Sequence, residues 1–208
     1  MQPVKIDCMP PRTDPVVLAE AMAALRGPAV AVGKLKAEQS GKPGLYAFYA
    51  SASTWKDLGL GKPPDDRPLY VGKAENTLAS RDVEVHFGMR ERGVQSPTGS
   101  STLRRSLAAL LTHRRGYRGI PRNPAKPGNF SNFGLSAEHD DDLSAWMRGR
   151  LRLALWPHDL AAALDGIETD VLGELQPPLN LDKVMTPWRG QVKGARKVLA
   201  DQARDWDG

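Results

Sequence analysis

Four residues that suit phosphodiester chemistry follow one another along the chain: Tyr46, Tyr70, Arg81 and Glu174. In-line hydrolysis of a phosphodiester needs a base or an oriented water, a cation that neutralises the phosphoryl oxygens, and support for the leaving oxygen. A carboxylate is a hard oxygen ligand that suits Mg²⁺ or Mn²⁺, and an arginine clamps a phosphate with its planar fork. An unperturbed tyrosine has a pKa of about 10, so a tyrosine base requires the site to stabilise the phenolate or a metal-bound water to ionise instead.

Two short strands are predicted to position the tyrosines. Gly44–Ala50 and Pro68–Gly72 are rich in aromatic and β-branched residues, and each is bounded by glycine or proline. Side chains alternate across a strand, so an antiparallel pairing has a register in which Tyr46 and Tyr70 point the same way. Gly72 would then leave open space beside them for a phosphate or a helix. The connection between the strands is too long for a tight hairpin, and its Gly- and Pro-rich part is expected to be an irregular surface loop.

Helices are predicted to position the charged residues. A stripe of apolar residues predicts a helix over about Asp159–Leu175, and Glu174 lies about 60° from the centre of that stripe, at the border of the buried face. Arg81 occupies a comparable border position in a helix over about Asn76–Arg92. The same reasoning predicts helices over Asp14–Leu25 and Ser101–Arg115 and a strand over Leu151–Trp156.

The order of these residues resembles the GIY-YIG nuclease family. The resemblance rests on Gly44-Leu45-Tyr46, on Tyr70-Val71-Gly72-Lys73, on the helical Arg81 and Glu174, and on the exit Pro177-Pro178-Leu179-Asn180. Leucine and valine replace the isoleucines of the two half-motifs. The resemblance covers about residues 42–180 and is specific at some fifteen positions.

The family resemblance implies a role for each residue. Glu174 would be the metal ligand, Tyr46 the general base or water-orienting group, and Tyr70 its hydrogen-bonding neighbour. Arg81 would clamp the scissile phosphate, and Lys73 would add positive charge. Asn180 would bond to substrate phosphate or hold the active-site loop in shape.

His86 is a further candidate whose spacing departs from the family pattern. Family sites often place a histidine about one helical turn after the arginine, where positions i and i+4 share a face. The spacing between Arg81 and His86 is five, which puts the two side chains about 140° apart on a regular helix. A shared phosphate would require an irregular helix.

The net positive charge of the chain is weak evidence for a polyanionic partner by itself, so the argument depends on where the basic residues are concentrated. The chain has 208 residues, 29 Lys and Arg and 24 Asp and Glu, hence a net charge of +5. A predicted loop over Arg114–Lys126 is basic and has interleaved aromatic residues, so it is the main candidate for nucleic-acid contact outside the catalytic set. The alternative is a solvated, disordered loop. Its candidate residues are Arg114, Arg115, Arg118, Arg122 and Lys126. The segment Arg189–Trp206 is also basic and predicts an amphipathic helix, which either presents its charge to DNA or is an ordinary surface helix.

Several classes of protein are excluded by composition. Cys8 is the single cysteine, which excludes an intramolecular disulfide framework and a Cys-rich zinc ribbon and fits a reducing compartment. The longest apolar stretch near the start, residues 16–32, is broken by charged residues and proline, so we expect neither a signal peptide nor a membrane span. The expected location is the cytoplasm.

The expected fold is an α/β domain of the α+β type, with a small, mainly antiparallel sheet flanked by helices. We expect an N-terminal helical extension over 1–36, a catalytic domain over 37–185 with an insertion at about 96–142, and a basic C-terminal segment over 186–208. The expected function is a Mg²⁺- or Mn²⁺-dependent endonuclease that hydrolyses DNA and leaves a 5′-phosphate. The alternatives are an inactive nucleic-acid-binding or regulatory module on the same scaffold, and a protein-interaction domain in which the motifs are coincidental. The DNA structure that is cut, the biological role and the oligomeric state stay open.

Overall fold

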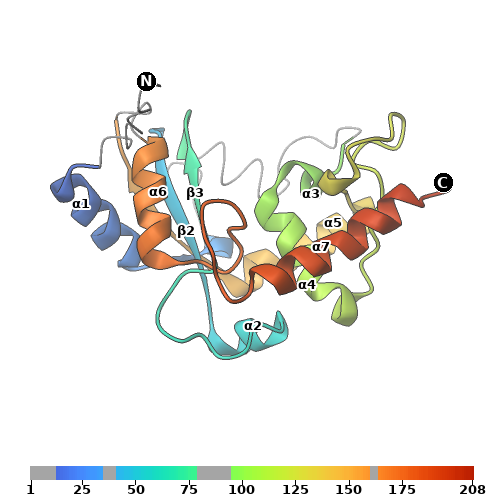
Figure 1. Cartoon of the computed structure of the whole chain (residues 1–208), viewed down its shortest axis with the longest axis horizontal. Coiled ribbons are helices and arrows are strands. Elements are labelled where there is room, and N and C mark those ends of the chain that lie inside the picture. The colour runs from blue at the N-terminus through green and yellow to red at the C-terminus, as the bar shows by residue number, and fades with distance from the viewer. Residues whose placement is uncertain (1–12, 35–40, 79–94, 160–163) are drawn as a thin grey trace, which may run out of the picture.

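A computed structural model describes residues 13–34, 41–78, 95–159 and 164–208 of the chain (Figure 1). In chain order the elements are α1 (Pro15–Arg26), β1 (Val30–Ala31), η1 (Val32–Lys34), β2 (Gly44–Ala50), α2 (Ala52–Asp57), β3 (Tyr70–Ala74), α3 (Pro97–Ser100), α4 (Thr102–Arg115), η3 (Phe130–Asn132), α5 (Ala137–Arg150), β4 (Leu151–Pro157), α6 (Leu164–Leu175) and α7 (Arg189–Arg204). Among these helices, none has the length and apolar composition needed to span a membrane.

The four strands form one sheet in the order β1-β4-β2-β3, and every neighbouring pair is antiparallel. The predicted mixed fold with a small antiparallel sheet is therefore confirmed. β2 has the predicted bounds, whereas β3 begins and ends two residues later than predicted. β2 lies inside the sheet between β4 and β3, so β3 is an edge strand.

Each face of the sheet is covered by its own set of helices. The alternation of β2 sends Tyr46 and Phe48 into one hydrophobic core and Leu45 and Ala47 into the other. The first core is completed by residues of α2, α4, α5 and α7, and the second by residues of α1 and α6. Figure 1 shows the two helical layers on opposite sides of the strands. The tyrosine of the first half-motif therefore faces α4 and α7, and α6 lies behind the sheet.

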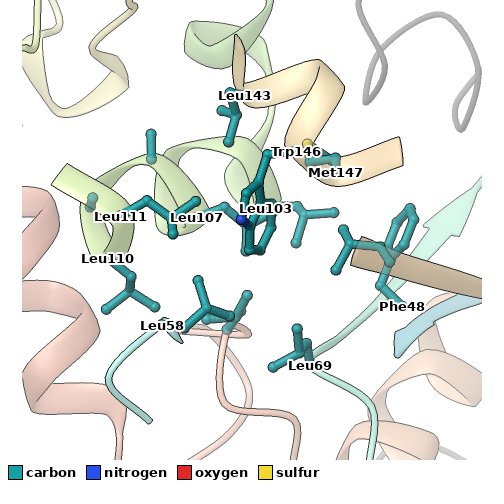
Figure 2. Packing of buried hydrophobic residues seen from close by; sticks show 14 of the residues in the cluster. Phe48, Leu58, Leu69, Leu103, Leu107, Leu110, Leu111, Leu143, Trp146 and Met147 are labelled. Atoms are coloured by element: carbon teal, nitrogen blue, oxygen red, sulfur yellow. The ribbon is translucent and has the colours of Figure 1, made fainter. Parts of the chain in front are cut away.

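The larger core is built mainly on the leucines of α4. Leu103, Leu107, Leu110 and Leu111 recur at helical spacing and are all buried, as their pattern predicted. Figure 2 shows them in one cluster with Trp146 of α5 and the side chains of Leu58, Leu69 and Phe48. The helix ends at Gly116, which adopts the left-handed conformation that glycine allows at a C-cap. Part of the stretch that the sequence predicts as an insertion thus supplies the main core.

The connection between β2 and β3 contains a helix that its composition did not predict. In α2, the Ser51 hydroxyl accepts a hydrogen bond from the Thr54 N–H, which caps the first turn. Trp55 is fully buried, and its ring lies 5.6 Å from the ring of Trp188. The glycine- and proline-rich part that follows, residues 59–64, lies outside any helix or strand, as expected.

Helices α1, α6 and α7 confirm the helices predicted over 14–25, 159–175 and 189–206. Where the structure describes their ends, the observed and predicted bounds agree within about two residues. The helix predicted over residues 76–92 lies mostly outside the described residues. The proposed division of the chain into an extension, a catalytic domain and a basic tail stays a prediction.

A buried polar network joins α3, α4 and α5. The side chain of Arg104 is fully buried and donates to the carboxylate of Asp140 at 3.0 Å, to its backbone oxygen at 2.9 Å and to Ser144 Oγ at 2.9 Å. Asp140 also accepts hydrogen bonds from the hydroxyls of Ser96 and Thr98. A buried arginine in this fold is thus neutralised by a buried carboxylate.

Candidate active site

Tyr46 and Tyr70 lie on the same face of the sheet, as predicted. Tyr46 is paired with Gly72, and Phe48 with Tyr70, so both tyrosines have the same parity across the β2–β3 ladder. Their ring centroids are 6.3 Å apart and the ring planes are tilted by 35°. Tyr46 is only 1% exposed, whereas Tyr70 is half-buried. Tyr70 is therefore the phenol that a substrate reaches more readily.

Gly72 is required because the ring of Tyr46 lies directly against it. A β-carbon at this position would collide with Cζ and the phenolic oxygen of Tyr46 and would lie 2.9 Å from its Cε2. The expectation that Gly72 leaves open space for a phosphate or a helix is therefore wrong, because Tyr46 fills that space. The glycine allows the two half-motifs to pack against each other.

Asn180 holds the edge strand that carries Tyr70. Its Oδ1 accepts a hydrogen bond from the Val71 N–H at 2.9 Å, and its Nδ2 donates to the Val71 carbonyl at 2.7 Å. The backbone N–H of Leu179 donates to the carbonyl of Leu69 at 3.0 Å. The Pro177–Asn180 segment thus covers the open edge of β3. Of the two roles open to Asn180, these contacts favour holding the loop in shape.

Lys73 points to the other face of β3 and belongs to a group of alternating charges. Its ammonium lies 2.8 Å from Glu75 and 3.0 Å from Asp165 at the start of α6. The hydrogen bond to Glu75 raises the pKa of Lys73, burial opposes this, and Asp165 raises it further. Lys183 lies 2.9 Å from Asp165 and 3.0 Å from Glu168. Lys73 is therefore an ion-paired residue next to α6 and lies across the sheet from the tyrosines.

Helix α6 presents two glutamates in different surroundings. Glu174 lies in the last turn, is exposed rather than at the border of the buried face, and forms no hydrogen bond or ion pair with the described residues. The Glu168 side chain is 13% exposed and is held by Lys183. The two glutamates are six positions apart, which places them about 120° apart around the helix and about 9 Å apart along it. They cannot serve one site as equivalent ligands.

Glu168 is a candidate that the sequence analysis missed. It follows Ile167 of the buried stripe and lies one turn from Asp165, which contacts Lys73 of the second half-motif. Of the two glutamates, it is therefore the one placed near β3. In the sequence, Glu168 could have been found from its position next to the apolar stripe. Its ion pair with Lys183 could not, because that contact is formed only in the folded chain.

Arg81 and His86 lie outside the described residues. Among the residues that the structure does describe, no three His, Cys, Asp or Glu side chains form a group able to hold a metal ion. An ion with several water ligands needs one protein carboxylate, so one glutamate of α6 would suffice.

The five basic residues predicted to contact nucleic acid do not form one continuous loop. Arg114 and Arg115 belong to the last turn of α4, where they pair with Asp57 at 3.3 Å and Asp142 at 2.7 Å. The other three, Arg118, Arg122 and Lys126, follow the helix; Arg118 and Lys126 are exposed, and Arg122 packs over α3.

A polar pocket of about 620 Å³ lies between α2, α4 and α5. It is lined by Asp57, Leu111, Arg114, Arg115, Glu138, His139, Asp142, Trp146 and Arg150. Its arginines are paired with carboxylates of the same pocket, and neither tyrosine lines it. It is therefore separate from the tyrosine pair.

Comparison with known proteins supports the assignment of the second half-motif. A family model described as the GIY-YIG catalytic domain matches residues 64–197, well over half of the chain. The match includes β3, α4, α6 and Asn180, and it begins after Gly44-Leu45-Tyr46 on β2. Neither the curated proteins nor the solved structures gave a match.

Proposed function

Because the chain belongs to the family of GIY-YIG catalytic domains, which implies nuclease activity in general, we propose that it is a divalent-metal-dependent endonuclease that hydrolyses phosphodiester bonds in DNA. The observation that carries the proposal is the placement of Tyr46 and Tyr70 on one sheet face, 6.3 Å apart, with the strand of Tyr70 fixed by Asn180. The product would carry a 5′-phosphate, as the family resemblance implies.

In this proposal the two phenols act together on the attacking water. Tyr70 is half-buried and faces the substrate, and Tyr46 lies behind it against Gly72. Arg105 and Arg196 lie close enough to Tyr70 for their charges to interact with it. Arg81 is proposed to clamp the phosphate.

A glutamate of α6 is proposed to hold the cation, Mg²⁺ or Mn²⁺. The donor set fits a hard ion, because a carboxylate oxygen with waters and substrate oxygens completes its preferred shell. When bound, the cation would stabilise the charge that develops on the phosphoryl oxygens. Glu174 is the candidate from the helical pattern, and Glu168 is the candidate from the structure, since it shares Lys183 with Asp165 beside β3. Because α6 covers the sheet face opposite to the tyrosines, the proposal requires the cation to lie at the end of β3, where Lys73 meets Asp165.

Carboxamide substitution of each glutamate tests the assignment. Glu168→Gln and Glu174→Gln change the same charge on the same helix and preserve side-chain volume. We expect Glu168→Gln to lower Mg²⁺-dependent nicking of plasmid DNA at least about 100-fold, and Glu174→Gln to leave it within about two-fold. The reverse result would assign the ligand to Glu174. Full activity in both variants would refute a catalytic carboxylate on α6.

The inactive binding module remains as the alternative outcome. It predicts salt-sensitive binding without cleavage of duplex, branched or single-stranded DNA in either Mg²⁺ or Mn²⁺. The 1% exposure of Tyr46 is the observation that favours it, because this phenol reaches a substrate only after movement.

A further inference from the structure

Three arginines gather where α3, α4 and α7 meet. Arg105 lies on α4 and Arg196 on α7, and Arg122 lies in the segment after α4. Within the described ranges, no carboxylate forms an ion pair with any of the three. This group, which we call the arginine cluster, was not predicted from the sequence, although Arg122 and Arg196 each belong to a basic segment.

Arg105 is the most enclosed member, with an exposed fraction of 8%. Its guanidinium donates to the carbonyl of Gly99 at 2.6 Å and to Thr102 Oγ1 at 3.2 Å. Its Nε is buried and has no hydrogen-bond partner among the described residues. A buried N–H without an acceptor is costly and rare, so it needs an explanation.

Arg122 meets Arg105 at Gly99. A β-carbon at Gly99 would lie 2.9 Å from both Cβ and Cδ of Arg122, so the side chain of Arg122 covers the glycine. The Nε of Arg122 is also buried and without a partner within the described part of the chain. The guanidinium of Arg105 and the aliphatic part of Arg122 thus meet at Gly99, and each of the two arginines has an unused Nε–H.

Arg196 brings a third positive charge from α7, which packs along α4 as Figure 1 shows. Burial, together with the charges of Arg196 and Arg122, lowers the pKa of Arg105 to about 10. Burial also lowers the pKa of Arg196, while Asp182 and Tyr70 oppose that effect. The cluster is therefore a concentration of positive charge next to the candidate catalytic phenol.

The neighbouring Arg104 is a buried arginine with a structural role, and it provides a comparison for Arg105. Arg104 is bonded to Asp140 and Ser144 and lies in a network that leaves its charge compensated. Arg105 is the next residue, and no carboxylate within the part of the chain that the structure describes forms an ion pair with it. Like charges without a counter-ion destabilise a fold. The anion that balances the arginine cluster is therefore expected to come from outside the residues that the structure describes.

We propose that Arg105, Arg122 and Arg196 bind a backbone phosphate of the nucleic-acid substrate beside Tyr70. This phosphate site rests on the proposed nuclease function. It adds that the bound nucleic acid runs from the tyrosines towards α3 and α7. Guanidinium groups suit this ligand because their forked N–H donors match phosphate oxygens. Arg122 and Arg196 are half-buried and reach the phosphate directly, whereas the buried Nε–H groups of Arg105 and Arg122 become donors to it only after a local movement.

The test compares two adjacent charges on α7. Arg196→Gln removes a cluster residue, and Lys197→Gln removes an exposed lysine that is paired with Asp201 at 2.5 Å. Binding of a fluorescent DNA duplex is measured by anisotropy in EDTA over a series of salt concentrations. We expect Arg196→Gln to weaken binding about ten-fold or more and to reduce the slope of log affinity against log salt by about 0.9. Lys197→Gln should stay within about two-fold of the wild type.

A second measurement uses inorganic phosphate as the probe and does not depend on DNA. At constant ionic strength, phosphate should raise the melting temperature of the wild type and of Lys197→Gln, and should raise that of Arg196→Gln much less. Arg105→Lys keeps the charge but not the fork, and should show the same deficit as Arg196→Gln while circular dichroism confirms that it is folded.

The outcomes separate this inference from the proposed function. If the wild type cuts DNA but Arg196→Gln and Lys197→Gln bind it equally well, the arginine cluster is not a phosphate site and the nuclease assignment stands. If phosphate stabilises the wild type through Arg196 but DNA is neither bound nor cut, the cluster binds another phosphate compound, so this inference and the nuclease assignment both fail as stated. If neither DNA nor phosphate binds, both are overturned.

Discussion

The buried carboxylate of Asp140 should be among the most costly single side chains to remove from this fold. Asp140 accepts hydrogen bonds from Ser96, Thr98 and Arg104, and the Arg104 side chain that it neutralises is 0% exposed. In Asp140→Ala, the guanidinium keeps its charge in a site without solvent. Breaking a buried ion pair in this way costs about 3–5 kcal/mol. Because α3 is tied to α4 and α5 through this network, Gly99 and the arginine cluster should also lose their fixed geometry.

Urea unfolding at pH 7, followed by circular dichroism, measures this loss. With a urea dependence of about 2 kcal/mol per M, a loss of about 4 kcal/mol moves the unfolding midpoint down by about 2 M. The matched control is Asp141→Ala, which removes an exposed carboxylate from the next position of α5 and should cost less than about 1 kcal/mol. Asp140→Asn keeps the volume and one acceptor oxygen and should fall between them. Equal midpoints for Asp140→Ala and Asp141→Ala would refute the account of this network.

Two further predictions concern β2 and β3. Asn180→Ala leaves the N–H and the carbonyl of Val71 without their partner, so the free energy of unfolding in urea should fall by about 2–4 kcal/mol. A loss below about 1 kcal/mol would show that the two hydrogen bonds of Asn180 are dispensable for stability. Burial raises the pKa of Tyr49 from 10.0 to about 12, so its neutral phenol stabilises the fold fully below about pH 10, and this contribution is lost as the pH rises towards 12. Tyr49→Phe also removes a 2.8 Å hydrogen bond to the carbonyl of Leu25, so the variant should be about 1 kcal/mol less stable than the wild type at pH 7. This difference in stability should close between pH 10 and 12. A difference that stays constant over that interval would contradict the raised pKa of Tyr49.

Local patterns in the sequence predicted most of the framework. The bounds of β2 and the leucine stripe of α4 follow from periodicity alone, because each element buries one side of a regular repeat. Helix α2 was missed because glycines and prolines follow it within a few residues, although Ser51 was available as its N-cap.

Charged residues were harder to place, because their partners are distant in the chain. Arg104 and Asp140 are 36 residues apart and both look like surface residues of a helix, yet both are buried. The position of Glu174 relative to the apolar stripe suggested a border site, but the side chain is exposed in the last turn of α6. The enclosure of Glu168 depends on Lys183, which comes from a loop that the helical pattern does not include. Pairing of this kind is set by the fold rather than by local spacing.

The role of Gly72 illustrates a similar limit. A glycine beside two aromatic strands was interpreted as space for a ligand, because a sequence does not show what fills a missing side chain. The ring of Tyr46 fills it, which makes the glycine a packing requirement of the tyrosine pair itself.

The most direct test of the central claim is the initial rate at which purified wild type and Tyr70→Phe nick supercoiled DNA in Mg²⁺, with binding measured in parallel in EDTA. The account predicts nicking by the wild type, and a rate at least about 100-fold lower in Tyr70→Phe with an unchanged dissociation constant, because only the phenolic oxygen is lost. Equal rates in the two proteins, or no cleavage by the wild type in Mg²⁺ or Mn²⁺, would contradict it.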